Sequence, residues 1–391
     1  MAEGILIAFP FTGTLVGGSY HSAALLAGAL EQRAGIRCAV LLPREGPNSA
    51  VFQANGLTPE YYGLSEKHVI LMRHTESILA KLRALGAYRA TYLAALRWLR
   101  SNRPSIVHIN DDRTMLDWGM AAKRLGIPVV WHVRQRTGSR LLDRVRLQLA
   151  DYLIFLAEDA RRHRFRERQL QSKPHCVIYN AVDTSVFYPP PDRSSAKAAL
   201  GVSPKSIVLC YLGNLTPRKR PEWVVEAGIS LLQEGLDVEV LVVGHDRSGG
   251  QLENALKERV ERAGCADSFH FLGYRSDVAE ILRAVDILGM PSIAEPFGRV
   301  VIEAMASGVV VVATNAGGVP EIIQDGVNGM LVPSHDFTAF VSAIRKLCLD
   351  PALRDALSME GIRTVQKRFS VDTMVEQVLE VYRELLQRDR K

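Results

Sequence analysis

Short runs of β-branched and aliphatic residues alternate along the chain with longer segments that repeat apolar positions every three or four residues. The short runs are typical of strands buried on both faces of a parallel sheet, and the longer segments are typical of the helices that cover it. Strands are predicted at 5–9, 38–42, 105–109, 129–133, 152–156, 207–212, 238–243, 269–273, 285–290 and 309–313. Helices are predicted at 20–34, 79–100, 116–125, 160–169, 221–233, 299–307, 336–349, 351–368 and 371–388. This alternation predicts the α/β fold class.

The length of the chain indicates two domains. Its 391 residues suit two domains of about 150–200 residues better than one. The run Pro189, Pro190 and Pro191 is rigid and exposed in character, which favours a boundary there. The predicted divisions are therefore 1–190 and 191–370, with a final helix at 371–391.

The composition is that of a globular protein with an ample core. Hydrophobic residues make up 47% and charged residues 23%. We expect a cytoplasmic protein, because the segment MAEGILIAFPF lacks the features of a signal peptide and no apolar run approaches the ~18 residues that span a bilayer. The five cysteines are scattered without paired spacing and are interpreted as core residues, not as bridges or metal ligands.

Two glutamates frame the start of the helix predicted at 299–307. Glu295 lies in the loop before this helix and Glu303 lies inside it, with seven residues between them. A helix that begins near Gly298 places Glu303 roughly 7–8 Å along its axis. Because the free amides of a helix N-terminus attract anions, this spacing suits a diphosphate held between two carboxylates that bind hydroxyl groups. A nucleotide-sugar has this shape. The alternative is a structural helix start beside one solvated glutamate.

The segments EPFGRVVIEAMASG and ATNAGGVPEIIQDGVNGMLV, at 295–308 and 313–332, resemble the signature of retaining glycosyltransferases of family 4, which have the GT-B fold. The likeness covers most of the chain and is dense from 179 to 332. It implies two facing Rossmann-like domains, the first binding the acceptor and the second a nucleotide-sugar. It also implies that the last helix crosses back onto the first domain, through an apolar stripe of Leu379, Tyr382 and Leu386. Val310 departs from the family, which usually has proline there.

The resemblance gives residues of the second domain their roles. Glu303 is expected to hold the donor ribose, and Glu295 the hydroxyl groups of the transferred sugar. The backbone around Tyr274 is expected to meet the nucleobase. The diphosphate is expected to meet the helix start, at Phe297, Gly298, Arg299 and Val300.

Two residues of the first domain also match positions that the family directs at the donor. Gly18 belongs to a glycine pair before a helix, which lets the backbone approach a phosphate, although such loops are often only tight turns. His132 lies at the end of the strand at 129–133, where the family usually has a histidine that faces the donor sugar. A lone histidine at a strand end is otherwise more often structural.

The loop GNLTPRKRPEW contains the clearest departure from the family pattern. Lys219 matches a lysine that binds the diphosphate, whereas Asn214 replaces an arginine with the same task. A diphosphate needs cationic compensation. Arg218 or Arg220 could supply it from the same loop, and Arg218 is favoured. The alternative is that the loop only caps the following helix.

Charge is unevenly distributed between the two halves. Residues 1–190 contain 25 Lys and Arg against 15 Asp and Glu, a balance of +10, and the rest contain 23 against 27, a balance of −4, which sum to +6. Basic clusters at 134–146 and 161–168 suggest contact with an anionic membrane or a polyprenyl-diphosphate acceptor on the inner membrane face. Solvated helix faces are the alternative, and the lack of interleaved aromatic residues argues against nucleic acid. The predicted surface consists of Arg161, Arg162, Arg164 and Arg166.

The predicted chemistry is metal-independent transfer with retention of configuration. The sequence contains no clear metal-ligand cluster and no pair of carboxylates suited to a covalent intermediate, so we favour front-face displacement in which the leaving diphosphate accepts the acceptor proton. Asp111 and Asp112 are expected to cap a helix. No cofactor is expected beyond a UDP- or GDP-sugar donor. A soluble acceptor, a nucleotide-sugar epimerase and a binding protein without activity remain as alternatives.

Overall fold

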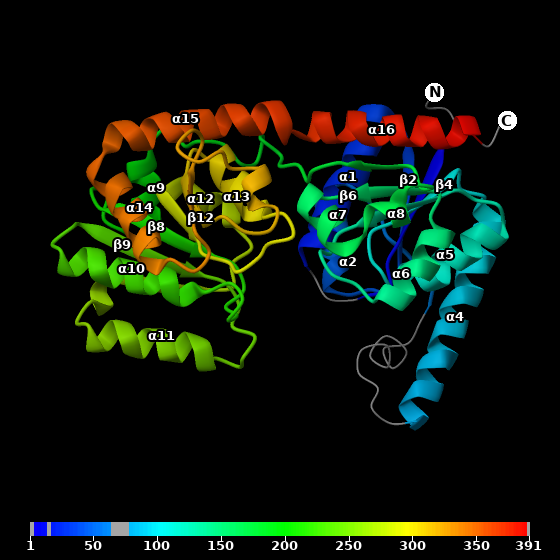
Figure 1. Cartoon of the computed structure of the whole chain (residues 1–391), viewed down its shortest axis with the longest axis horizontal. Coiled ribbons are helices and arrows are strands. Elements are labelled where there is room, and N and C mark those ends of the chain that lie inside the picture. The colour runs from blue at the N-terminus through cyan, green and yellow to red at the C-terminus, as the bar shows by residue number, and fades with distance from the viewer. Residues whose placement is uncertain (1–3, 14–16, 64–77, 389–391) are drawn as a thin grey trace. The chain divides into compact units, whose positions relative to one another are not determined.

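The computed structural model describes residues 4–13, 17–63 and 78–388 and divides the chain into two units. The first contains the chain up to Asn180 together with the segment from Val371 onward, and the second runs from Ala181 to Ser370. Each is an α/β unit built on one parallel sheet (Figure 1).

The sheet of the first unit has the strand order β3-β2-β1-β4-β5-β6-β7. The central strands are buried on both faces, as their apolar runs predict. The strands are β1 (Leu6–Pro10), β2 (Arg37–Leu42), β3 (Glu60–Tyr61), β4 (Ile106–Ile109), β5 (Val129–Val133), β6 (Tyr152–Phe155) and β7 (His175–Val177). The helices are α1 (Gly18–Ala34), α2 (Pro47–Gln53), α4 (Ile78–Asn102), α5 (Thr114–Arg124), α6 (Arg140–Leu149), α7 (Glu158–Arg164), α8 (Glu167–Leu170) and α16 (Val371–Arg388).

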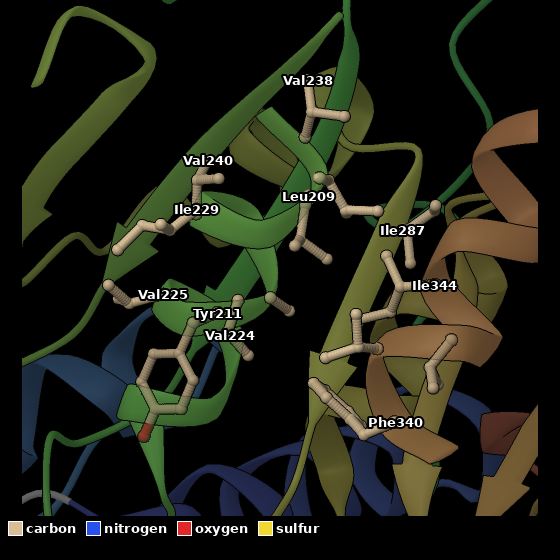
Figure 2. Close-up of a cluster of buried hydrophobic side chains, with 14 of the residues drawn as sticks. Leu209, Tyr211, Val224, Val225, Ile229, Val238, Val240, Ile287, Phe340 and Ile344 are labelled. Carbon is tan, nitrogen blue, oxygen red and sulfur yellow. The ribbon is translucent and has the colours of Figure 1, made fainter. Parts of the chain in front are cut away.

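The sheet of the second unit has the order β10-β9-β8-β11-β12-β13. Its strands are β8 (Ile207–Leu212), β9 (Val238–Val243), β10 (Phe269–Gly273), β11 (Ile287–Met290), β12 (Val310–Thr314) and β13 (Met330–Val332). Its α-helices are α9 (Arg193–Ala199), α10 (Pro221–Gln233), α11 (Gln251–Arg262), α12 (Val278–Ala284), α13 (Arg299–Ala306), α14 (Phe337–Leu349) and α15 (Pro351–Arg368). Figure 2 shows part of the core, in which Leu209 and Ile287 of the sheet face Val224 of α10 and Phe340 of α14.

In both sheets the order in which the chain adds strands reverses beside the strand that comes first in the sequence, β1 or β8. In the second unit the chain leaves β8 for β9 and β10, and then returns to the other side of β8 as β11. The first unit does the same between β1 and β4. Loops at such a reversal diverge above the carboxyl ends of the strands, which is where open α/β sheets bind ligands. We therefore expect a ligand site at the loops after β8 and β11.

The predicted strands and most of the predicted helices are confirmed to within two residues at either end. The helix predicted at 160–169 is wrong, because the chain forms α7 and α8 with an extended residue, Phe165, between them (φ −123°, ψ 143°). Phe165 is buried against Trp131 and Phe155, at ring-centroid distances of 5.9 and 5.7 Å. Burying this ring interrupts the helix.

The last helix packs on the first unit, as predicted. α16 contacts α1, and Asp372 forms an ion pair with Arg33. The predicted stripe is correct only for Tyr382, because Leu379 and Leu386 are half-buried. The buried face of α16 consists of Val371, Met374, Val375, Val378, Val381, Tyr382 and Leu385.

Candidate functional site

The loops after β8 and β11 are tied together at the point where the second sheet reverses. The backbone N–H of Ile293 donates to the carbonyl of Arg218 at 2.9 Å. The hydroxyl of Thr314, at the end of β12, donates to the carbonyl of Ser292. The first bond joins the two loops, and the second joins the loop after β11 to the end of β12.

Glu295 forms the centre of a cluster with the two basic residues favoured from the sequence. Its carboxylate is buried, with 6% of the residue exposed. A carboxylate oxygen lies 2.5 Å from Nζ of Lys219 and 3.4 Å from a guanidinium nitrogen of Arg218. Arg218 also donates to the carbonyl of Ala294, while half of its side chain remains exposed. The fold thus brings together residues that lie about 76 positions apart in the sequence.

Arg220 is directed elsewhere. Its backbone is left-handed (φ 51°) at the start of α10, and its guanidinium lies 4.8 Å from the ring centroid of Trp223. It also donates to the carbonyl of Ser334. Of the two arginines that flank Lys219, only Arg218 is in contact with Glu295.

The helix α13 begins where the motif predicts. Gly298 has φ 101°, a conformation that glycine adopts without strain, and it precedes Arg299 as the N-cap. The first amides of a helix have no intrahelical acceptor, so this end can bind an anion. The ring of Phe297 is buried, with its centroid 5.9 Å from that of Phe369. Only the backbone of Phe297 can therefore take part in binding.

Both glutamates of the motif carry a basic partner. Glu303 is 7% exposed, and its carboxylate lies 2.6 Å from the guanidinium of Arg299, one turn earlier in α13. Glu295 has Lys219 and Arg218. The two carboxylates thus hold three cations around the start of α13, an arrangement that suits a ligand carrying both phosphates and hydroxyl groups.

Close backbone packing fixes the position of Glu295. Its carbonyl accepts the N–H of Gly318 at 2.8 Å. A Cβ atom at Gly317 (φ +65°) would lie 2.2 Å from the same carbonyl oxygen. The glycine pair in TNAGG is the signal for this contact, and sequence reasoning assigned it no role.

The ends of β8, β9 and β10 are also packed closely. A Cβ at Gly244 would lie 1.8 Å from the carbonyl oxygen of Gly213, and the N–H of Gly244 donates to the carbonyl of Gly273 at 2.8 Å. Tyr274 follows directly and is 69% exposed. Beside these strand ends is a pocket of about 450 Å³, lined by Leu215, Thr216, Pro217, Arg247, Ser248, Gln251, Leu252 and Ala255. Sequence reasoning did not identify Arg247 and Ser248, because they lie in a loop without a motif.

In the first unit, His132 is buried near the end of β5, with 1% of the residue exposed. Its Nδ1 lies 3.2 Å from Nε2 of His108 and 3.3 Å from a guanidinium nitrogen of Arg134. Gly18 is the first residue of α1. Residues 14–16 of the predicted phosphate loop lie outside the described residues. Asp111 accepts hydrogen bonds from the backbone N–H and the hydroxyl of Thr114, the first residue of α5, as expected of a cap, whereas the carboxylate of Asp112 pairs with Arg164 instead.

The predicted arginine surface is wrong for Arg164. Its side chain is 1% exposed and forms ion pairs of 2.7 Å with Asp112 and Asp143. Arg161 is also largely covered, with 12% of its side chain exposed and ion pairs to Glu158 and Glu167. These pairs neutralise most of the expected positive charge. The exposed members of the predicted surface are Arg162 and Arg166.

An exposed apolar surface instead lies on α6, within the other basic cluster. Leu141 is 71% exposed, and Leu142 and Val145 are also exposed. Arg140 and Arg144 flank them in exposed positions. The opposite face of the helix is buried. Sequence reasoning identified the charge of this segment but not its outward-facing apolar side chains.

No three His, Cys, Asp or Glu residues lie close enough to hold a metal ion within the part of the chain that the structure describes. Of the helices in the described ranges, none is long and apolar enough to cross a membrane.

Comparisons with known proteins identify the family. Residues 16–186 match the family described as Glycosyltransferase Family 4, and residues 192–364 match Glycosyl transferases group 1. A lipopolysaccharide core biosynthesis mannosyltransferase of Rhizobium meliloti (strain 1021) is 31% identical over 283 residues, which is 66% of this chain and 80% of that protein. The chain belongs to the group 1 glycosyltransferases, and its two units form the GT-B fold.

Other relatives agree on the class. A D-inositol 3-phosphate glycosyltransferase of Saccharomonospora viridis is 34% identical over 217 residues, 54% of this chain and 50% of that protein. The chain matches about half the length of these inositol phosphate glycosyltransferases. Among solved structures, Anabaena HepE in complex with UDP and glucose superposes with a TM-score of 0.79 at 22% identity, covering 97% of this chain and 100% of that one. This likeness shows the fold. The protein is a glycosyltransferase that acts on a nucleotide-sugar.

Proposed function

We propose that the protein transfers a hexose from a UDP- or GDP-sugar to a hydroxyl group of an amphiphilic acceptor, with retention of configuration and without a metal ion. The observation that carries this proposal is the cluster of Arg218, Lys219 and Glu295 beside the N-terminus of α13. It places two cations, a helix end and a buried carboxylate at one reversal point of the sheet, where α/β folds bind ligands.

In this proposal the diphosphate lies at the start of α13. The amides of Gly298, Arg299 and Val300 and the side chain of Lys219 bind its oxygens. Glu303 accepts hydrogen bonds from the ribose, and Glu295 from the hydroxyl groups of the transferred sugar. Tyr274, which follows the packed ends of β9 and β10, is proposed to lie beside the nucleobase. Structures of Anabaena HepE with UDP-glucose support a donor of this class by their likeness in fold.

The chemistry follows from the charge that develops on the leaving group. As the bond from the anomeric carbon to the diphosphate breaks, the diphosphate gains negative charge, and fixed cations stabilise that charge most in the transition state. The acceptor oxygen attacks on the same face, and its proton passes to the departing phosphate oxygen. Lys219 and Arg218 stabilise the diphosphate, while the buried Glu295 keeps Lys219 in place.

Asn214 stands where the family has an arginine, and we assign to Arg218 the positive charge that this arginine would supply to the diphosphate. Arg218 lies in the Glu295 cluster and half of its side chain is exposed, so its guanidinium can turn to a phosphate. Arg220 is held by Trp223 and Ser334 and is not available for this role. Two arginines of the first unit could also be considered as the second cation. Arg136 already lies 2.5 Å from Asp159, and Arg134 is buried.

The acceptor is proposed to be lipid-linked and presented at an anionic membrane. The support is α6, on which exposed Leu141, Leu142 and Val145 lie between exposed Arg140 and Arg144. A helix of this kind lies in a membrane interface with its apolar side chains inserted and its basic residues at anionic headgroups. The relative from Rhizobium meliloti, named for lipopolysaccharide core biosynthesis, agrees with such an acceptor. A soluble acceptor is the alternative.

A donor screen tests the proposal. The protein is incubated with UDP-glucose, UDP-galactose or GDP-mannose, with and without a lipid extract as acceptor, in the presence of a chelator. Transfer predicts nucleotide release that rises with acceptor and persists in chelator. A changed sugar without nucleotide release would indicate an epimerase instead, and binding with neither change would indicate a protein without activity.

A further inference from the structure

The first residue of α13 carries a charge that the helix itself disfavours. Arg299 directly follows the N-cap residue Gly298, and the first turn of the helix contains no acidic residue. The N-terminus of a helix carries a partial positive charge, so a cation in its first turn is repelled by the free amides. Residues that break a local rule of this kind are expected mainly at functional sites.

The side chain of Arg299 is paired with Glu303, one turn later in the same helix. A guanidinium nitrogen lies 2.6 Å from Oε1 of that carboxylate. The order of the two residues is the weaker one for a helix, because such a pair stabilises more when the acidic residue precedes the basic one. Helix stability therefore explains neither the position of Arg299 nor its choice of partner.

The pair determines which oxygen of Glu303 can meet a ligand. Only 9% of the Glu303 side chain is exposed, so loss of its cationic partner would be costly. Arg299 occupies Oε1, and within the described residues the other oxygen, Oε2, accepts no hydrogen bond. A carboxylate that is held at one oxygen also loses most of its freedom to rotate. Oε2 is therefore available, in a fixed orientation, to accept hydrogen bonds from hydroxyl groups of a ligand.

We propose that the side chain of Arg299 is a positioning residue, which holds Glu303 so that Oε2 accepts hydrogen bonds from the hydroxyl groups of the donor ribose. The inference rests on the proposed function, in which Glu303 binds the ribose. It gives the side chain of Arg299 a task separate from that of its backbone amide, which is proposed to meet the diphosphate. Arg299 thereby makes the site selective for nucleotides that carry a complete ribose.

The alternative is that the guanidinium of Arg299 binds the diphosphate directly. Its side chain is 27% exposed, and arginine is a common partner of phosphates. The two roles differ in the part of the ligand on which they depend. Positioning acts through Glu303 and concerns only nucleotides with ribose hydroxyl groups, whereas a direct contact strengthens binding of the phosphates whether or not the hydroxyl groups are present.

The test compares nucleoside diphosphates that differ only in the ribose. Calorimetry gives the dissociation constants of UDP and 2′,3′-dideoxy-UDP, and of GDP and 2′,3′-dideoxy-GDP. We expect the unchanged protein to prefer the complete ribonucleotide by about 10-fold or more, the effect of hydrogen bonds to a carboxylate. Arg299→Leu should reduce this preference to about 3-fold or less, and should change the affinity for the dideoxy nucleotide less than about 2-fold.

A double variant shows whether Arg299 acts through Glu303. Glu303→Gln should lower the preference by itself, and the addition of Arg299→Leu should change it no further, because no carboxylate is left to orient. Arg299→Lys should keep part of the preference, since an ammonium can pair with the carboxylate but lacks the planar fork of a guanidinium. Arg363→Leu is the matched control, because it breaks a pair with Glu360 within α15 of the same unit, and it should leave the preference unchanged.

The fold of each variant is checked by thermal unfolding. Arg299→Leu leaves Glu303 without its partner, whereas the double variant removes both charges and should remain as stable as the unchanged protein. If Arg299→Leu alone does not fold, the double variant and Glu303→Gln decide the question. A different preference for the ribonucleotide in these two proteins would mean that Arg299 acts without Glu303, which overturns the inference.

The remaining outcomes separate the inference from the proposed function. If the unchanged protein binds none of these nucleotides, or binds the ribonucleotide and the dideoxy form equally, the proposed donor site is wrong and the inference falls with it. If the unchanged protein prefers the ribonucleotide and Arg299→Leu retains that preference, the positioning role is refuted while the donor site stands. Equal weakening of both forms by Arg299→Leu would assign the guanidinium to the diphosphate, which also overturns the inference.

Discussion

The ammonium of Lys219 lies 2.5 Å from the carboxylate of Glu295, and this pair joins the loop after β8 to the loop after β11 where the sheet reverses. The pair has two consequences for the proposed donor site. It stabilises the carboxylate in a buried position, and it holds the cation beside the start of α13. A change to either residue should therefore affect the other.

Alanine substitutions of the three consecutive basic residues at 218–220 should show how much each contributes to turnover. Lys219→Ala should lower turnover at least 10-fold, because it removes a cation from the leaving group and leaves Glu295 without its closest partner. Arg218→Ala should lower turnover about 10-fold. Arg220→Ala is the matched control and should have a mild effect on turnover, because Arg220 faces Trp223. Single-turnover transfer measures all three.

A substitution at Asn214 also tests whether Arg218 replaces the missing arginine. Asn214→Arg should restore part of the turnover lost in Arg218→Ala by returning a cation to the same loop, whereas Asn214→Gln should not. If Arg218→Ala transfers sugar at the rate of the unchanged protein, Arg218 does not compensate for the missing arginine.

The two glutamates should differ in their kinetic effects. Glu303→Gln should mainly weaken donor binding, by about 1.5–3 kcal/mol, because a charged acceptor for the ribose hydroxyls becomes a neutral one. Glu295→Gln should lower turnover more than donor affinity. Donor titration by calorimetry and steady-state kinetics provide the two readouts. Unchanged kinetics in both variants would show that the donor binds elsewhere.

Substitution of Gly317 should lower stability by more than the cost of its left-handed backbone conformation alone. Gly317→Ala places a methyl group 2.2 Å from the carbonyl oxygen of Glu295, in addition to the roughly 1–2 kcal/mol cost of a left-handed alanine. Gly326→Ala is the matched control, because its φ is +70° and nothing lies within 4 Å of the added atom. We expect a larger fall in thermal stability and in turnover for Gly317→Ala. Equal losses would mean that the loop moves to accept the methyl group.

Membrane binding should depend on the apolar side chains of α6. Replacement of Leu141 and Leu142 by Ser should reduce sedimentation with anionic liposomes, and salt should weaken the binding that remains. Leu349→Ser, which changes a leucine of the second unit that is 63% exposed, is the control. Equal sedimentation of the unchanged protein with neutral and anionic liposomes would favour a soluble acceptor. Arg164 is unsuitable for this test because it is buried in ion pairs.

Transfer should persist after exhaustive chelation. Lys219, Arg218 and the N-terminus of α13 are proposed to compensate the diphosphate charge, a task that a divalent cation performs in metal-dependent transferases. Initial rates with and without chelator measure the effect, and we expect less than a 3-fold change. A complete loss that added Mg²⁺ or Mn²⁺ restores would contradict the mechanism.

Local sequence patterns determined most of the secondary structure and one part of the candidate site. The apolar runs at 129–133 and 207–212 are long enough to specify buried strands without their neighbours. Glu295, Gly298 and Glu303 lie on one loop and one helix, so their spacing along the chain determines their spacing in space. Lys219 was found by resemblance to a family motif, not by geometry.

Tertiary structure decided which charged and apolar groups are exposed and which distant residues meet. Arg164 belongs to a basic run, yet it is buried because Asp112 and Asp143 approach it from other segments. Leu141 is an apolar residue of the kind that fills protein cores, yet it is 71% exposed. The contact between His108 and Tyr382 joins positions 274 residues apart. Burial and partners of this kind depend on how strands and helices are ordered around the sheets, and no local pattern of residues contains that order.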